Sequence, residues 1–198
     1  MNEYDEIRNW IFKKYDKVIK KMELTPKRWL HVEGSMKCAY GLALKYGLET
    51  EKCVLAALLH DYFRDKNKEE IIELAKKYRV KLKKFDLKYP NVLHGKVAVN
   101  YFKEMKYKIP KEILKGIKHH TLGNDNFCEY GMLLFVVDAI EETRSYDGVE
   151  CLRNYIATHS LKDGYKEVLR RTLSDLIKKN KEIPLVTAKA YNKILEDN

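Results

Sequence analysis

Residues 53–64, with the sequence CVLAALLHDYFR, carry the most information about the fold. Every position from Cys53 to Leu59 is apolar, and the pair His60-Asp61 follows directly. A helix that is apolar nearly all round belongs in a protein core, so we expect a central helix from Cys53 to about Arg64. Burial of an aspartate is costly unless the carboxylate is paired or bound to a metal ion. The stretch therefore predicts a polar centre within or beside a helical core.

The remainder of the chain also shows helical patterning. Nine glycines and four prolines are too few for an all-β fold. Thr25-Pro26 predicts the start of a helix that runs to Tyr46, with Gly47 as its C-cap. The first helix is expected to place Ile7, Trp10, Ile11, Tyr15, Val18 and Ile19 on one apolar face. Further helices are expected over residues 68–79, 92–106, 110–120, 127–144, 148–159 and 161–180, with a short one after Pro184 and a lysine-rich loop over residues 81–88.

These segments predict one all-α domain over residues 1–198, built as a bundle of about eight or nine helices. A chain of 198 residues with 45% hydrophobic content can bury a substantial core. Its longest apolar runs are too short to span a bilayer. The polar, acidic stretch 1–6 argues against a secretory signal peptide. The four cysteines are widely spaced without a CxxC pair, so we expect a reduced, cytoplasmic protein without disulfides.

The formal net charge is +10, which suggests an anionic partner. Of the 39 basic residues, 31 are lysines and only eight are arginines. Lysines scattered over polar helix faces are usually solvated surface, so the charge alone does not identify the partner. The histidines and aspartates are more specific.

Several histidines and a second aspartate accompany the pair His60-Asp61. They are His31, His94, the pair His119-His120, and Asp138, which stands alone in an apolar run. Imidazole and carboxylate groups suit iron, manganese, zinc or cobalt. The residues suffice for two ions: His31, His60, Asp61 and Asp138 for one, and Asp61, His94 and His120 for the other. Two such ions can share a hydroxide and clamp a phosphoryl group.

The order H…HD…H…H…D resembles that of the HD-domain metal-dependent phosphohydrolases. The residues that flank this pattern form the segments RWLHVEG (28–34), LLHDYFR (58–64), NVLHG (91–95), IKHHTLG (117–123) and VDAIEETR (137–144). Together these segments resemble the YqeK family of symmetrical diadenosine tetraphosphate hydrolases. The resemblance spans about residues 25 to 196. The chain departs from the family pattern at Ser35, Val137 and Glu142, and none of these positions is a proposed ligand.

The resemblance implies a di-iron or similar centre with His31, His60, Asp61, His94, His120 and Asp138 as ligands. It also implies cleavage of diadenosine tetraphosphate between its central phosphates, by a metal-bridging hydroxide, to give two ADP. Asp61 and Arg64 are then the expected catalytic residues. The expected substrate contacts are Arg28, Arg64, Lys96, Thr121, Gly123 and Arg144. We expect His119 beside the ligands rather than among them, and Glu141 to orient a ligand histidine.

Two alternatives stay open from the sequence. The chain can be another HD-domain phosphohydrolase that acts on cyclic dinucleotides, deoxynucleoside triphosphates or guanosine alarmones. It can also be a basic RNA- or ribosome-binding protein on an HD fold, although retention of all six ligands argues against this. Neither a membrane nor a nucleic acid is an expected partner, and a homodimer is one open oligomeric state.

Overall fold

The structure is a computed structural model that describes residues 2–196. Over these residues it contains twelve α-helices, one short 3-10 helix and no strand, which confirms the all-α expectation. The helices are α1 (Glu3–Lys14), α2 (Asp16–Ile19), α3 (Pro26–Tyr46), α4 (Thr50–Leu59), α5 (Lys68–Lys77), α6 (Lys84–Lys88), η1 (Pro90–Val92), α7 (His94–Glu104), α8 (Lys111–His119), α9 (Glu129–Ile140), α10 (Val149–Thr158), α11 (Leu161–Lys178) and α12 (Leu185–Glu196).

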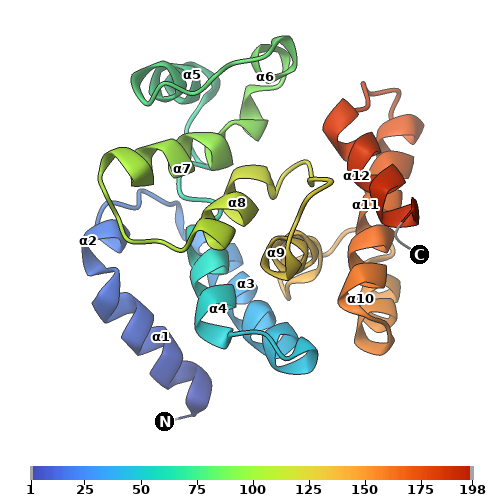
Figure 1. Ribbon diagram of the computed structural model, residues 1–198, viewed down its shortest axis with the longest axis horizontal. Coiled ribbons are helices and arrows are strands. Elements are labelled where there is room, and N and C mark those ends of the chain that lie inside the picture. The colour runs from blue at the N-terminus through green and yellow to red at the C-terminus, as the bar shows by residue number, and fades with distance from the viewer. Residues whose placement is uncertain (1, 197–198) are drawn as a thin grey trace.

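Helix α9 lies in the middle of the fold (Figure 1). It packs against α3, α4 and α8 on one side and against α10 and α11 on the other. The run from Leu133 to Val137 is almost completely buried, because neighbouring helices cover it from several directions. The expectation of a helix within residues 127–144 is confirmed. Its central position places Asp138, which belongs to its last turn, near the middle of the molecule.

Helices α3 and α4 form the second element of the core, and they pack closely against each other. The Thr25 side chain accepts a hydrogen bond from the Arg28 backbone N–H, and Pro26 occupies the first turn of α3. Gly47 ends α3 in the left-handed conformation with a φ of 66°. These caps are those expected from the sequence. All seven residues from Cys53 to Leu59 are buried, as the opening stretch predicted.

The structure corrects three details of the sequence interpretation. The expected number of helices was too low, partly because α6 forms within the segment expected to be a loop. The first apolar segment is not one helix: it breaks at Tyr15 into α1 and α2, and Trp10 is 47% exposed rather than part of the buried face. Helix α4 ends at Leu59 instead of near Arg64, because the chain continues in single turns that bring His60 and Asp61 toward the centre.

The structure bears on the expected lack of membrane-spanning segments and of disulfide bonds. No helix within residues 2–196 is long and apolar enough to cross a membrane. All four cysteines are free, with Cys53 buried and Cys128 and Cys151 exposed. The absence of disulfides agrees with the spacing of the cysteines along the chain.

Candidate metal centre

Six side chains from five segments of the chain meet between the helices. His31 lies in α3, and His60 and Asp61 immediately follow α4. His94 begins α7, His120 follows α8, and Asp138 belongs to the last turn of α9. The four histidines and Asp61 are at most 5% exposed, whereas the Asp138 side chain is 25% exposed. The fold therefore buries five of these polar groups and leaves one edge of the cluster open.

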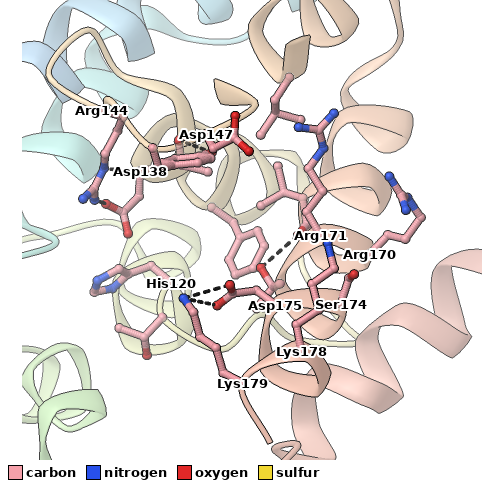
Figure 2. Close-up of a pocket in the computed structure, with 17 residues that line it drawn as sticks. His120, Asp138, Arg144, Asp147, Arg170, Arg171, Ser174, Asp175, Lys178 and Lys179 are labelled. Carbon is pink, nitrogen blue, oxygen red and sulfur yellow. Dashed lines mark hydrogen bonds and ion pairs between the residues drawn. The ribbon is translucent and has the colours of Figure 1, made fainter. Parts of the chain in front are cut away.

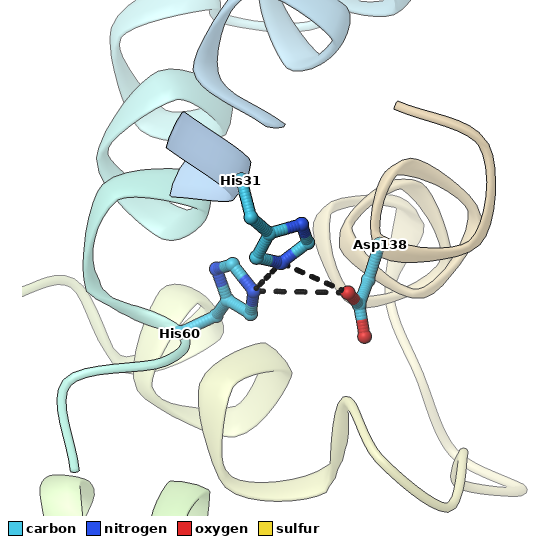
Figure 3. A group of neighbouring side chains, drawn as sticks. All are labelled: His31, His60 and Asp138. Carbon is cyan, nitrogen blue, oxygen red and sulfur yellow. Dashed lines mark hydrogen bonds and ion pairs between the residues drawn. The ribbon is translucent and has the colours of Figure 1, made fainter. Parts of the chain in front are cut away.

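The first half of the cluster consists of His31, His60 and Asp138, which point toward one another from α3, the end of α4 and α9 (Figure 3). The Nε2 atoms of His31 and His60 are 3.1 Å apart. Asp138 Oδ1 lies 3.3 Å from His31 Nε2 and 3.8 Å from His60 Nε2. Three donor atoms thus surround one small space.

The second half contains His94 and His120, whose Nε2 atoms are 2.9 Å apart. Asp61 lies between the two halves. Its Oδ1 is 3.0 Å from His94 Nε2 and 3.6 Å from His120 Nε2. Its Oδ2 is 3.5 Å from His60 Nε2 and 3.6 Å from His31 Nε2. One carboxylate therefore faces both histidine pairs, with a different oxygen on each.

Every cluster histidine is oriented through its other ring nitrogen. The Nδ1 atoms of His60, His94 and His120 each lie 2.7–2.8 Å from the backbone carbonyl three residues earlier. His31 Nδ1 instead lies 3.0 Å from Glu141 Oε1. A carbonyl or carboxylate accepts a hydrogen bond from Nδ1–H, so the proton stays on Nδ1 and Nε2 is left as the metal-binding atom of each ring.

The short distances between the inward-facing Nε2 atoms indicate whether these residues fit a metal ion. Two unprotonated Nε2 atoms carry lone pairs that repel each other at 2.9 Å or 3.1 Å. A cation beside each pair, either a proton or a metal ion, removes this repulsion. Neutral imidazoles with fixed Nδ1–H groups, together with carboxylates, form a donor set used by zinc and by first-row transition metals. The residues fit such an ion.

The electrostatics of the cluster agree with this fit. Burial alone would raise the pKa of both Asp61 and Asp138, but the surrounding histidines, and Arg144 at Asp138, hold both values below the usual range. Burial lowers the pKa of His60 to about 4, so its imidazole is neutral at pH 7. At His31, burial opposes protonation, but Asp138 and Glu141 raise the pKa to about 9. The cluster thus combines ionised carboxylates with a strong local attraction for positive charge.

Glu141 is a fully buried carboxylate outside the cluster. Besides its contact with His31 Nδ1, it accepts hydrogen bonds from the Thr143 backbone N–H at 2.8 Å and the Thr143 hydroxyl at 2.5 Å. A Cβ atom at Gly34 would lie 2.3 Å from Glu141 Oε2. The carboxylate therefore lies directly against α3 at Gly34, where a larger residue would displace it.

Replacement of Glu141 by glutamine is expected to weaken metal binding about 10- to 100-fold, a range typical of lost partners of metal-bound histidines. The amide keeps the shape but loses the charge that faces His31 Nδ1. Competition with a chromophoric chelator measures the affinity. Glu142→Gln is the matched control, since Glu142 is exposed and pairs with Lys37 on the surface. Equal metal affinity of Glu141→Gln and the control would contradict the expected role of Glu141.

Two arginines hold the carboxylates at the edges of the cluster. Arg28 donates to Asp61 Oδ2 at 2.7 Å and to Asp65 Oδ1 at 3.3 Å. Arg144 donates to the Asp138 backbone carbonyl at 2.7 Å and also pairs with Asp138 Oδ1. Both guanidinium groups therefore border the cluster.

The other predicted site residues lie at different distances from the cluster. Arg64 and His94 line one small cavity of about 170 Å³. Thr121 lines a larger cavity together with His120 and Asp138. Lys96 is directed elsewhere: its ammonium lies 2.5 Å from the buried carboxylate of Asp86.

His119 and Gly123 lie outside the ring of donor atoms. His119 is partly buried near the ring of Phe127, and burial together with nearby lysines lowers its pKa to about 4. Gly123 has a φ of 75°, and a Cβ atom there would lie 3.0 Å from both Leu169 and the Tyr165 hydroxyl. Gly123 therefore forms a turn packed against α11.

The larger cavity shows what the sequence interpretation missed. It has a volume of about 640 Å³ and extends from His120 and Asp138 to the side chains of α11 (Figure 2). Arg170, Arg171 and Lys178 come from that helix, and Lys179 directly follows it. The doublets Arg170-Arg171 and Lys178-Lys179 were visible in the sequence, but no motif connected them with the histidines.

Comparison with protein families matches residues 28–143 to the HD domain. That range is more than half of the chain and contains all six cluster residues. The chain belongs to the HD-domain family. The match confirms the family resemblance of the five motifs, and the all-α arrangement described above is an HD-domain fold.

Curated relatives of this HD-domain chain include three proteins named bis(5'-nucleosyl)-tetraphosphatase, symmetrical. The protein of Halalkalibacterium halodurans is 34% identical over 88% of this chain and 92% of its own length. Those of Bacillus subtilis and Staphylococcus aureus are 28% and 30% identical, over 87% and 91% of this chain. The similarity therefore extends well beyond the HD motifs.

A crystal structure from Clostridium acetobutylicum has a similar fold. It is described as a predicted HD superfamily hydrolase involved in NAD metabolism. The two chains are 27% identical, the TM-score is 0.85, and the match covers 93% of this chain and 98% of the other. The helices on both sides of the cluster are thus shared with that structure.

Proposed function

We propose that this protein hydrolyses diadenosine tetraphosphate between its central phosphates and releases two ADP. The observation that carries the proposal is the convergence of four histidine Nε2 atoms on Asp61 and Asp138. Three relatives that match over most of the chain are named for the symmetrical reaction. The metal-site chemistry of the cluster and the names of the relatives support the same function.

The proposal includes two metal ions, which the resemblance suggests are iron. His31, His60, Asp61 and Asp138 would hold one ion, and Asp61, His94 and His120 the other. Such ions supply Lewis acidity and a water molecule of lowered pKa as the nucleophile. Asp61 is the proposed shared ligand because its two oxygens face different histidine pairs.

The surrounding cations have distinct proposed roles. Arg28 and Arg144 fix the orientations of Asp61 and Asp138 through direct contacts. Arg64 has no ion pair among residues 2–196, and it lines the small cavity beside His94. An unpaired guanidinium near the cluster can bind a phosphate in a bidentate manner. We assign Arg64 to the polyphosphate chain on this side.

A product-resolved assay tests the proposed function. The full chain is loaded anaerobically with Fe²⁺, Mn²⁺ or Co²⁺ and incubated with diadenosine tetraphosphate, and the nucleotides are separated by ion-exchange chromatography. The expected product is ADP alone, in a metal-dependent reaction. Formation of AMP and ATP would contradict the symmetrical cleavage.

The same assay distinguishes the alternatives. Turnover of a cyclic dinucleotide, a deoxynucleoside triphosphate or an alarmone, without cleavage of diadenosine tetraphosphate, would assign the chain to another group of HD-domain phosphohydrolases. Purified protein that binds no metal but binds RNA in a salt-dependent manner would overturn the enzymatic proposal altogether.

A further inference from the structure

The cavity of about 640 Å³ opens directly on the open edge of the cluster. His120, Asp138 and Arg144 lie at one side, and the labelled side chains of α11 lie across from them (Figure 2). Its volume is in the usual range for small-molecule sites. A phosphate held at the cluster would therefore have room beside it for a larger group.

The walls of this cavity combine charged and apolar side chains. Phe135 and Ala139 of α9, Leu152 of α10 and Val168 of α11 contribute apolar surface. Mixed walls of this kind fit a ligand with an anionic end and a flat, weakly polar end. A nucleotide has both ends.

Tyr146 is the aromatic side chain that stands out in this cavity. Over the described part of the chain, Tyr146 and Trp10 are the two aromatic residues in the exposed class, at 45% and 47%. Trp10 belongs to α1 and is not among the residues lining the cavity, whereas Tyr146 lines it together with Asp138. An exposed ring in a cavity next to a phosphate-binding centre can stack on a nucleobase.

Contacts within the protein hold the Tyr146 ring in place. Its hydroxyl donates to the Ala139 carbonyl at 2.8 Å, and its own carbonyl accepts from the Val149 N–H at 3.1 Å. Arg153 fixes the same loop by donating to the carbonyls of Glu141 at 2.7 Å and Arg144 at 2.9 Å. A ring already fixed in position loses little conformational freedom when a base stacks on it.

The charges around the cavity favour a polyphosphate. Five cationic side chains line it, namely Arg144, Arg170, Arg171, Lys178 and Lys179, against three carboxylates, Asp138, Asp147 and Asp175. Arg170 and Arg171 pair with Glu167, and Lys179 pairs with Asp175. Lys178 has no ion pair within residues 2–196, so its ammonium is available to a ligand.

We propose that this cavity binds one nucleoside diphosphate half of the substrate, with the nucleobase stacked on Tyr146 and the phosphates directed toward Asp138 and Arg144. The inference rests on the proposed function for the identity of the whole substrate. It adds the location of one half and a specific residue for recognition of the base. The other half then extends toward Arg64 and His94, which line the separate small cavity.

Binding of the product ADP to the metal-loaded full chain tests the assignment, with titration calorimetry as the readout. Tyr146→Ala is expected to weaken ADP binding about tenfold, within the range measured for loss of one aromatic–base stack. Pyrophosphate, which lacks a base, is expected to bind equally to the variant and the original protein. Tyr146→Phe keeps the ring and should lose much less affinity for ADP, and Tyr146→Leu should behave like the alanine variant.

Tyr130→Ala is the matched control. Tyr130 is a partly buried tyrosine on α9 whose hydroxyl donates to Glu49 at 2.8 Å, and it does not line the cavity. Equal ADP affinity in Tyr146→Ala and the original protein would overturn the proposal, and so would a parallel loss of ADP and pyrophosphate binding.

The assignment of Tyr146 and the proposed function can succeed or fail independently of each other. If ADP binding depends on Tyr146 but the chain does not cleave diadenosine tetraphosphate, the proposed reaction fails and the cavity stands as a nucleoside diphosphate site. If the chain cleaves diadenosine tetraphosphate with an unchanged KM in Tyr146→Ala, the reaction stands and the assignment of Tyr146 fails.

Discussion

Replacement of Asp61 by asparagine is expected to abolish turnover and to remove much of the bound metal. The carboxylate is 3% exposed, and its two oxygens face the two histidine pairs separately. An amide cannot offer two anionic oxygens, so neither half of the cluster keeps its full donor set. We expect kcat to fall by about 1,000-fold or more, as for loss of a group that supports the transition state directly.

Metal analysis and steady-state kinetics together check this expectation. Asp86→Asn is the matched control, because Asp86 is a second buried aspartate, 1% exposed, and pairs with Lys96 away from the cluster. The control should lose stability but keep its metal content. Retention of both metal and turnover in Asp61→Asn would contradict the proposed position of Asp61 as the shared ligand.

Replacement of Gly95 by alanine should have the second largest effect. A Cβ atom at Gly95 would lie 2.3 Å from the Ile117 backbone carbonyl and 3.2 Å from His120 Nδ1. That carbonyl is the acceptor that orients His120, at 2.8 Å from its Nδ1. Relief of the clash requires α7 and α8 to separate, which displaces His94 and His120 relative to each other.

We expect Gly95→Ala to lose about 1–3 kcal/mol of stability, as is usual for overpacking, and at least tenfold in metal affinity. Thermal unfolding with and without metal provides the measurement. Gly41→Ala is the control: Gly41 also lies in a helix, and a Cβ atom there meets nothing within 4 Å. The control should be neutral or slightly more stable, because alanine favours a helix over glycine. Unchanged metal binding in Gly95→Ala would contradict the close approach of α7 to α8.

The sequence allowed prediction of the helices that have clear caps or strong periodicity. Thr25-Pro26 and Gly47 delimit α3 as expected, since both caps depend on local backbone chemistry. The six polar residues could be grouped because each stands out against apolar neighbours or beside another histidine. Their convergence to within a few ångströms depends on the tertiary packing of the helices, which the spacing of residues along the sequence does not specify.

Other features depend on contacts that no local pattern encodes. The chain breaks at Tyr15 although the apolar spacing continues through Ile19, and the Tyr15 hydroxyl donates to the distant Lys108 carbonyl at 3.3 Å. The short helix α6 carries Asp86, whose partner Lys96 lies on α7. The position of α11 beside Asp138 depends on the packing of α9 against α11, so its basic side chains could not be assigned to the site beforehand.

The origin of the six side chains in five separate segments also connects the proposed metal centre with folding. Ligands that bind only the folded chain stabilise it in proportion to the logarithm of their free concentration. Metal ions held between α3, α4, α7, α8 and α9 would act as internal cross-links over most of the core. The supply of metal in the cell would then set the lifetime of the protein against proteolysis as well as its catalytic rate, and a metal-starved cell would contain less of it.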